Sequence, residues 1–568
     1  MGSLKTDMNI PRIMIAAPSS GSGKTLITCG LLELLKDKGL NLSAFKCGPD
    51  YIDPMFHSKV LGLKSRNLDS FFTEPEVLRQ LFEKNAEGSD MAVIEGVMGY
   101  YDGLGGFSYR ASAYDVACIT NTPVIFVLNC KGMSLSVIPY IKGFLEYEKD
   151  SHIKGVILNK LSPMLYKRMK QEIEGELPVK VLGYVPQVDF TLESRHLGLI
   201  MPDEIEDLKA QLKGLAEVLE ESLETEEIIK LARSAEEIEK KQEELSSSDK
   251  KRARSYPEDP SSGSVRKNPC KDSTQEVLPE KDPDCFWPGK GKTSPQGRGA
   301  VYPGYRDDDP DKDNMLSFRS EEVMICKKEK NTADPFKGSR ADIYVKIREK
   351  EGTPKPVLNR PLRIGLAKDE AFCFFYEDNL SLLREMGAEL IEFSPIHDPH
   401  LPEDLDGLLL YGGYPELSAR ELSENLSMKK EIRQAIEKGL PTMAECGGFM
   451  YLHEKMEGDD GNFYPMAGVI KGTVYKTSHL TRFGYVTLSG GRAFGREVGE
   501  LPSHEFHYYD SENCGDAFLA KKPLSGRSWR CIHSSDTLFA GYPHMYYYGN
   551  KKLPEAFLAA ALRRANGL

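Results

Sequence analysis

The sequence predicts an α/β protein whose two domains are separated by a long region of different composition. Short apolar runs alternate with helical segments in both halves, which favours parallel sheets covered by helices. A Ser/Gly-rich turn after the first apolar run has the spacing of a phosphate-binding loop. Between the halves, Glu, Lys, Ser, Pro and Asp dominate and hydrophobic periodicity is lost. We therefore expect domains at residues 10–235 and 359–568, joined by a disordered insertion at 236–358 with a short structured island near 341–349.

Composition narrows the classes of function. A length of 568 residues exceeds one ordinary core, and the net charge of −12 gives no support to nucleic-acid binding. No apolar run reaches the ~20 residues of a membrane span, and no signal-peptide pattern opens the chain, so we expect a cytoplasmic protein without a membrane partner. The 11 cysteines are scattered without C-x-x-C pairs, which argues against a disulfide framework or a zinc site.

The expected phosphate loop follows a buried strand at 13–17 and opens a helix at 25–38. Its glycines let backbone N–H groups approach a polyphosphate, Lys24 would reach the β- and γ-phosphates, and the Thr25 hydroxyl would hold Mg²⁺. Pro18 stands where the common motif has its first glycine, so this loop is a variant. The candidate ATP-binding residues here are Ser20, Gly21, Ser22, Gly23, Lys24 and Thr25.

Three carboxylates follow predicted strands of the first half. Asp50 and Asp53 come after a strand at 42–46, and Glu95 ends a strand at 91–96. Ligands bind at the carboxyl ends of parallel strands, so these acids are candidates for Mg²⁺ or for the substrate. Asp50 or Asp53 could instead form an Asx turn, and Glu95 could be a solvated acid.

The rest of the first half offers weaker signals. Strands are expected at 124–129, 153–159 and 179–185, a capping box at 73–76, and helical spacing from 203 to 235. Asn159 could bind the purine of ATP or simply form a turn. Arg195 and His196 would suit an anionic substrate, and a solvated surface pair is at least as reasonable.

In the second half, strands are expected at 362–367, 389–393 and 407–411, and a helix at 428–438. Gly412 and Gly413 follow the third strand and could supply oxyanion-binding N–H groups. Cys446 lies between a strand and Gly447-Gly448 in the pattern of a nucleophile elbow, and we expect the following helix to lower the pKa of its thiol.

A cysteine nucleophile needs a histidine base. Ser503-His504-Glu505-Phe506-His507 offers one, and so does His544 in Gly541-Tyr542-Pro543-His544. Spacing alone does not decide between them. The common acid two residues after the histidine is missing at His544, where Met545 and Tyr546 follow.

Taken together, the motifs resemble those of the cobyrinic acid a,c-diamide synthase family. They are A-P-S-S-G-S-G-K-T, K-C-G-P-D-Y-I-D, E-G-V-M-G-Y-Y-D-G, G-G-Y-P-E, A-E-C-G-G-F-M-Y-L and H-E-F-H-Y. The resemblance covers nearly everything outside the insertion. It implies an N-terminal domain like dethiobiotin synthetase and a flavodoxin-like class I glutamine amidotransferase domain.

The activity that this resemblance implies is the ATP- and glutamine-dependent amidation of two acetate carboxylates on a tetrapyrrole, either cobyrinate or nickel-sirohydrochlorin. Cys446 and His544 match the glutaminase pair, with Gly412, Gly413 and Gly447 around it. The phosphate loop with Thr25, together with Glu95, matches the nucleotide and Mg²⁺ site. Asp50, Tyr51, Ile52 and Asp53 lie in the family's substrate segment.

Two other classes stay open from the residues. A nucleotide-switch ATPase of the partitioning type would share the phosphate loop but would have no use for Cys446-Gly447-Gly448. A dethiobiotin-type carboxylation would need no glutaminase half. The sequence leaves open a homodimer, the macrocycle and its metal.

Overall fold

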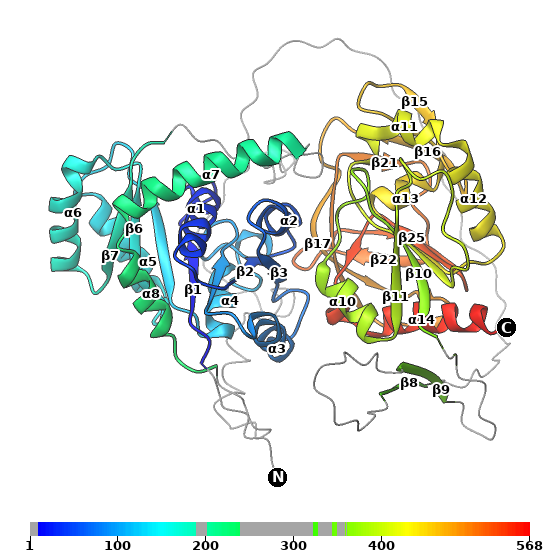
Figure 1. Cartoon of the computed structure of the whole chain (residues 1–568), viewed down its shortest axis with the longest axis horizontal. Helices are drawn as coiled ribbons and strands as arrows, with labels where there is room; N and C mark the ends of the chain where they lie inside the picture. Colours follow the sequence, from blue (N-terminus) through cyan, green and yellow to red (C-terminus); the bar gives the residue numbers. More distant parts are fainter. Residues whose placement is uncertain are drawn as a thin grey trace, which may run out of the picture. The chain divides into compact units, whose positions relative to one another are not determined.

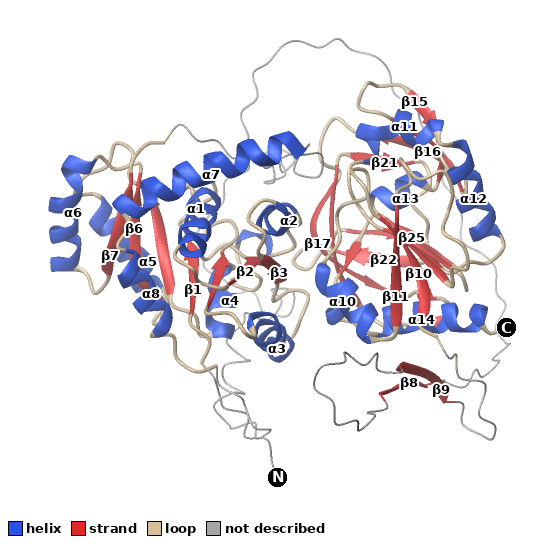
Figure 2. Ribbon diagram, in the orientation of Figure 1, coloured by secondary structure: helices blue, strands red, loops and turns tan. Residues whose placement is uncertain are grey.

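A computed structural model describes residues 9–188, 202–238, 322–327, 343–348, 358 and 360–567. The predicted substrate residues Arg195 and His196 lie outside these ranges. Figure 1 shows the chain with its elements labelled, and Figure 2 separates helices from strands. Within the described residues, no helix is long and apolar enough to span a membrane.

The N-terminal domain is built on a seven-stranded parallel sheet of order β3-β2-β4-β1-β5-β6-β7. Its strands are β1 (Arg12–Ala16), β2 (Leu42–Cys47), β3 (Lys64–Leu68), β4 (Met91–Glu95), β5 (Val124–Asn129), β6 (Ile153–Asn159) and β7 (Lys180–Val185). Because β1 lies between β4 and β5, the loop after it opens where the chain order changes direction. This is where open α/β sheets bind ligands.

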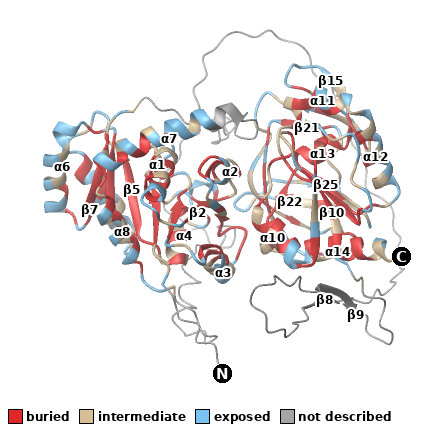
Figure 3. Ribbon diagram, viewed as in Figure 1, coloured by how far each residue is buried: buried red, intermediate tan, exposed pale blue. Residues whose placement is uncertain are grey.

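Helices cover both faces of this sheet. The helices are α1 (Lys24–Asp37), α2 (Ile52–Lys59), α3 (Pro75–Ala86), α4 (Ala113–Thr120), α5 (Val137–Tyr147), α6 (Pro163–Glu176), α7 (Pro202–Ser222) and α8 (Thr225–Arg233). Ile13 and Ile15 of β1 pack toward α1, α2, α7 and α8, whereas Met14 and Ala16 pack toward α3 to α6. Alternation along a doubly covered strand produces two apolar cores, which Figure 3 shows as buried strands between partly exposed helices.

Several local predictions for this domain were wrong or incomplete. The capping box fails because Glu74 is the N-cap of α3 without a side-chain cap, and the Thr73 hydroxyl donates to Asp69 O instead. The turn-rich segment predicted after β2 contains helix α2, and the single helical stretch from 203 to 235 is divided into α7 and α8. Strand β3 was missed because its sequence, Lys-Ser-Arg-Asn-Leu, is mostly polar.

The C-terminal domain contains a six-stranded sheet of order β11-β10-β12-β13-β25-β24. Its strands are β10 (Leu362–Ala367), β11 (Ala388–Phe393), β12 (Gly407–Leu410), β13 (Thr442–Glu445), β24 (His533–Ser534) and β25 (Leu538–Gly541). All pair in parallel except β24, so the five parallel strands have the order 2-1-3-4-5 of a flavodoxin-like sheet. The predicted fold class is confirmed for both domains.

Helices pack on each face of this second sheet. They are α10 (Glu377–Glu385), α11 (Ala419–Glu424), α12 (Leu426–Glu437), α13 (Gly447–Tyr451) and α14 (Lys552–Ala565). Side chains of α10 and α14 share one apolar core with Ile364 and Leu366 of β10, while α11, α12 and α13 share the other with Leu408 and Leu410 of β12.

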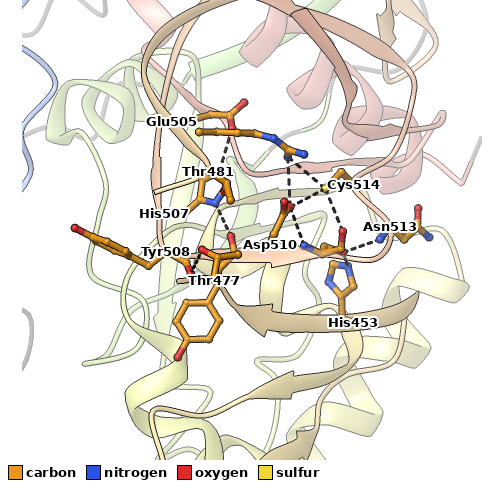
Figure 4. A network of polar contacts seen from close by, with 12 residues as sticks. His453, Thr477, Thr481, Glu505, His507, Tyr508, Asp510, Asn513 and Cys514 are labelled. Carbon is orange, nitrogen blue, oxygen red and sulfur yellow. Dashed lines mark hydrogen bonds and ion pairs between the residues drawn. The ribbon is translucent and has the colours of Figure 1, made fainter. Parts of the chain in front are cut away.

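Antiparallel strands extend this domain. One sheet has the order β15-β14-β16-β21 and another β23-β22-β17-β20-β26. Their strands are β14 (His453–Glu457), β15 (Phe463–Pro465), β16 (Ile470–Lys476), β17 (Arg482–Ser489), β20 (Leu501–His507), β21 (Tyr509–Ser511), β22 (Phe518–Lys521), β23 (Ser528–Cys531) and β26 (His544–Met545). Figure 4 shows polar contacts around Glu505, Asp510 and His453 in this part of the molecule.

The two domains belong to one compact unit by their internal contacts. Asn85 of α3 donates to Asp378 of α10 at 3.1 Å, and the Tyr485 hydroxyl of β17 donates to Asp69 at 2.7 Å. Within the region predicted to be a disordered insertion, strands β8 (Glu322–Lys327) and β9 (Ile343–Arg348) pair antiparallel, and β9 coincides with the predicted island.

Candidate active site

The phosphate loop runs from the end of β1 into α1, as predicted. Gly23 has a φ of 95°, and a Cβ there would lie 2.3 Å from Asn159 Nδ2, so no other residue fits. Asn159 donates from Nδ2 to Ser22 O at 2.9 Å, while its Oδ1 accepts from Lys160 N. This amide therefore holds the loop in shape, and its contact with ATP stays a prediction. Ser20 and Gly21 are exposed at the tip of the loop.

Lys24 lies folded over the loop. Its ammonium donates to Ser19 O at 3.1 Å and to Met98 O at 2.5 Å. Burial, together with the nearby Lys46 charge, lowers the pKa of Lys24 to about 8. Carbonyl oxygens thus hold the ammonium in the free protein, and a phosphate would be a stronger partner.

A buried charge cluster lies beside the loop. The Thr25 hydroxyl donates to Glu95 Oε1 at 2.6 Å, and Lys46 Nζ lies 2.8 Å from that oxygen and 2.5 Å from Asp53 Oδ2. Burial and the neighbouring Asp53 raise the pKa of Glu95 to about 7. Burial opposes the charge on Asp53, but the Lys46 ammonium outweighs it and lowers the pKa of that carboxyl. The two carboxylates thus share one cation.

The cluster fits Mg²⁺ chemistry. Glu95 Oε2 is buried without a hydrogen-bond partner, and Thr25 Oγ1 is within reach of the same carboxylate. Among the described residues no group of three or more His, Cys, Asp or Glu side chains could hold a metal by itself. Mg²⁺ commonly takes one or two protein oxygens, waters and phosphate oxygens, so Thr25 and Glu95 with a bound nucleotide would suffice.

The segment after β2 has two kinds of contact: turn and helix hydrogen bonds within its own domain, and ring contacts of Tyr51 with the C-terminal domain. Asp50 Oδ1 accepts from Ile52 N at 2.8 Å, so the Asx turn forms, and its predicted role as a metal ligand stays a prediction. Ile52 begins α2 and is half-buried. Tyr51 turns into an aromatic cluster, with its ring centroid 4.5 Å from that of Tyr376 and 5.2 Å from that of His544. A segment predicted to bind substrate thus contacts the C-terminal domain.

Cys446 occupies a strained turn between β13 and α13. Its φ of 45° and ψ of −104° lie outside the usual regions, and its N–H donates to Gly541 O at 2.8 Å. The close packing requires small neighbours, because a Cβ on Gly448 would lie 2.0 Å from Leu410 O. The elbow predicted from the sequence is confirmed in its geometry.

The predicted effect on the thiol was wrong. Burial, and then the Glu416 carboxylate, raise the pKa of the Cys446 thiol, and the opposing Gly447 N–H is outweighed. The thiol is therefore protonated at neutral pH. Any nucleophilic role requires a base that removes the proton.

The structure brings His544 to the same place as Cys446. A Cβ on Gly412 would lie 2.6 Å from His544 Cε1 and 3.5 Å from Cys446 Cβ, so only a glycine fits between the two side chains. His504 is in register with His544 on the neighbouring strand, and the centroids of the two rings are 6.0 Å apart. His507 is held by Glu505 at 3.0 Å and stacks on Tyr542.

The other predicted glycines surround the thiol. A Cβ on Gly447 would lie 3.1 Å from Gly413 N, so the Gly413 N–H lies close to Gly447, whose own N–H directly follows Cys446. A Cβ on Gly413 would lie 2.0 Å from Ala371 O. Two such N–H groups next to a thiol are the arrangement that can receive an oxyanion.

Two site residues were missed. Lys46 is the next-to-last residue of β2, and its position before Cys-Gly-Pro-Asp was a usable signal. Glu445 lies one residue before the cysteine, at the end of β13. Nothing in the sequence around it indicates that it lies close to His544, which is far away in the chain.

Comparison with known proteins agrees with this geometry. Residues 13–199 match the CobQ/CobB/MinD/ParA nucleotide binding domain, and residues 363–552 match the CobB/CobQ-like glutamine amidotransferase domain. An ATP-binding half joined to an amidotransferase half defines a glutamine-dependent amide ligase. A nucleotide switch without amidation does not account for the second domain.

Full-length relatives define the family more closely. Cobyrinate a,c-diamide synthase of Caldanaerobacter subterraneus subsp. tengcongensis is 32% identical, over 96% of this chain and 97% of its own. The proteins of the same name from Clostridium acetobutylicum and Listeria innocua are 32% and 31% identical, over 95% and 97% of this chain and 97% and 100% of theirs. The chain belongs to the cobyrinate a,c-diamide synthase family.

Proposed function

We propose that the protein converts the a- and c-acetate carboxylates of a tetrapyrrole to amides, using ATP and glutamine. The observation that carries this proposal is the pairing of a phosphate loop and acid cluster in one domain with Cys446 beside His544 in the other. The names of the relatives favour cobyrinate as the substrate. Nickel-sirohydrochlorin is the alternative macrocycle.

The N-terminal domain activates the substrate carboxylate, which is a poor electrophile. A substrate carboxylate oxygen attacks the γ-phosphorus of ATP, ADP leaves, and an acyl phosphate forms. Lys24 and the loop N–H groups neutralise the charge on the transferred group. When bound between Thr25, Glu95 and the phosphates, Mg²⁺ would supply further charge neutralisation.

In the C-terminal domain, Cys446 Sγ attacks the side-chain amide carbon of glutamine after His544 takes the thiol proton. The N–H groups of Gly413 and Gly447 receive the oxyanion, and ammonia leaves with the proton that His544 returns. Water then hydrolyses the thioester to glutamate. Ammonia attacks the acyl phosphate in the other domain, phosphate leaves, and the amide remains.

The substrate proposal is tested by mass spectrometry of the products formed when cobyrinate and nickel-sirohydrochlorin compete in one mixture with ATP, Mg²⁺ and glutamine. We expect cobyrinate to lose about 1 Da in each of two successive steps, because each amidation replaces the OH of a carboxyl group with NH2. Amidation of neither macrocycle would contradict the proposal. The cytoplasmic location, the homodimer and the roles of Arg195 and His196 stay predictions.

A further inference from the structure

Glu445 is a buried carboxylate beside the proposed glutaminase pair. It is the last residue of β13 and directly precedes Cys446. Its Oε2 lies 3.6 Å from His544 Nδ1, and both side chains are at most 3% exposed. Glu445 Oε1 and His544 Nδ1 are among the described buried atoms that lack a hydrogen-bond partner. The imidazole therefore faces the carboxylate with its Nδ1 unsatisfied.

The topology explains why they meet. Strands β13 and β25 are parallel neighbours, with Glu445 in register with Gly541. The chain leaves β25 at Gly541 and reaches His544 three residues later, at the start of β26. Burial raises the pKa of the Glu445 carboxyl well above its usual range, and the N–H of the next residue, Met545, donates to the carboxylate and opposes that shift. Both side chains are thus fixed by backbone at the carboxyl edge of the sheet.

A structural role does not account for this carboxylate. Burying an acid without a paired cation is costly, and an apolar residue at the end of β13 would avoid that cost. The nearby hydroxyls of Tyr411 and Tyr547 form a hydrogen bond of 2.7 Å with each other and not with Glu445. The group that Glu445 can serve is the imidazole.

We propose that Glu445 is the positioning residue of His544, the third member of the glutaminase site. Its carboxylate holds the Nδ1–H of the imidazole, which leaves Nε2 to accept the Cys446 thiol proton and later to return it to departing ammonia. Glu445 itself gains and loses no proton, and its charge stabilises the imidazolium. This inference rests on the proposed glutamine hydrolysis by Cys446.

The carboxylate beside His544 comes from the end of β13 and not from the segment that follows the histidine. The position two residues after the histidine holds Tyr546, whose hydroxyl donates to Asp378 at 2.8 Å. The residue before the nucleophile supplies the carboxylate instead. The same arrangement of groups is therefore built from a different place in the chain.

The test is Glu445→Gln in the full-length protein, with two readouts. We expect kcat for glutamine hydrolysis to fall by about 10²- to 10⁴-fold with little change in KM, because binding of glutamine is untouched. The pH profile of the rate of Cys446 alkylation by iodoacetamide should move to higher pH by about one unit, because the imidazolium loses its counter-charge. Ammonia-supported amidation should stay at the wild-type rate, which shows that the protein is folded.

Other titratable groups face His544, and the comparison keeps them constant. They are His504 on β20, Tyr51 before α2, Cys446 itself and, at longer range, His507. A matched control is Asp406→Asn, since Asp406 is also buried but pairs with Arg360 at 2.9 Å before β12 begins. That variant should lose stability without moving the alkylation profile.

A Glu445→Gln protein with wild-type glutamine hydrolysis and an unchanged alkylation profile would overturn the inference. If that variant also loses ammonia-supported amidation, Glu445→Asp decides, because a shorter acid should lower glutamine hydrolysis while the ammonia reaction persists. Wild-type hydrolysis in Glu445→Asp would then overturn it. Failure of the proposed function is separate, since it would appear as glutamine-supported amidation by Cys446→Ala.

Discussion

The Thr25 hydroxyl donates a hydrogen bond of 2.6 Å to Glu95, which joins the start of α1 to the end of β4. If this pair holds Mg²⁺ with ATP, Glu95→Gln should lower amidation on the order of 10²-fold with glutamine or ammonia alike. Glutamine hydrolysis should persist, because Cys446 lies in the other domain. Amidation assays over a Mg²⁺ titration check this, and full amidation by Glu95→Gln would contradict the metal assignment.

Lys46 is the shared cation of Asp53 and Glu95. Lys46→Met should lower the free energy of unfolding by about 3–5 kcal/mol, because it leaves two buried carboxylates without a counter-charge. Urea unfolding measures this loss. The control is Lys209→Met, whose exposed partner Glu206 lies 2.8 Å away, and it should change stability by less than about 1 kcal/mol. Equal effects in both variants would mean that the cluster contributes no more than a surface pair.

Tyr51 covers the imidazole of His544 from the N-terminal domain. Tyr51→Ala should open this side of the glutaminase pair to water, so that glutamate release exceeds amide formation. We expect a ratio of glutamate to amide close to one in the wild type and a ratio at least twofold higher in the variant. A ratio that stays at one would show that the ring has no part in coupling the two reactions.

Buried neutral histidines make the fold sensitive to acid. Burial lowers the pKa of His453 to about 4, while its Nδ1–H donates to Phe449 O and its Nε2 accepts from Ser511. In the unfolded chain, His453 binds a proton below about pH 6.5. In the folded protein, the same imidazole stays neutral until the pH reaches about 4. Stability is therefore present above pH 6.5 and is lost progressively as the pH falls to 4, by on the order of 3 kcal/mol for this residue.

The His453→Asn variant tests that contribution. Between pH 6.5 and 4, its free energy of unfolding should fall less steeply than that of the wild type, by roughly 1.4 kcal/mol per pH unit. The comparison uses urea unfolding at several pH values. Parallel curves for the two proteins would mean that His453 does not titrate differently on folding.

Local sequence patterns were sufficient for the parallel sheets and the two motif turns. Strands β5 and β6 were predicted at their observed bounds, since buried strands of a parallel sheet are continuous apolar runs. The polar strand β3 lacks that signal, so its place at the edge of the sheet had to come from the structure.

Site residues divide in the same way. Lys24, Thr25 and Cys446 were predictable because loop and elbow geometry constrains their immediate neighbours. The direction in which the pKa of the Cys446 thiol shifts was not predictable, because burial by distant segments outweighs the effect of the adjacent Gly447 N–H. Glu445 and His544 are 99 positions apart and meet only because β13 and β25 are adjacent.

The most direct measurement is amidation of cobyrinate by Cys446→Ala with ATP and Mg²⁺, using glutamine in one arm and ammonia in the other. We predict no amide with glutamine and a near wild-type rate with ammonia, because only the nitrogen supply depends on the thiol. Amidation that continues with glutamine would contradict the account, as would loss of both reactions in a variant that remains folded.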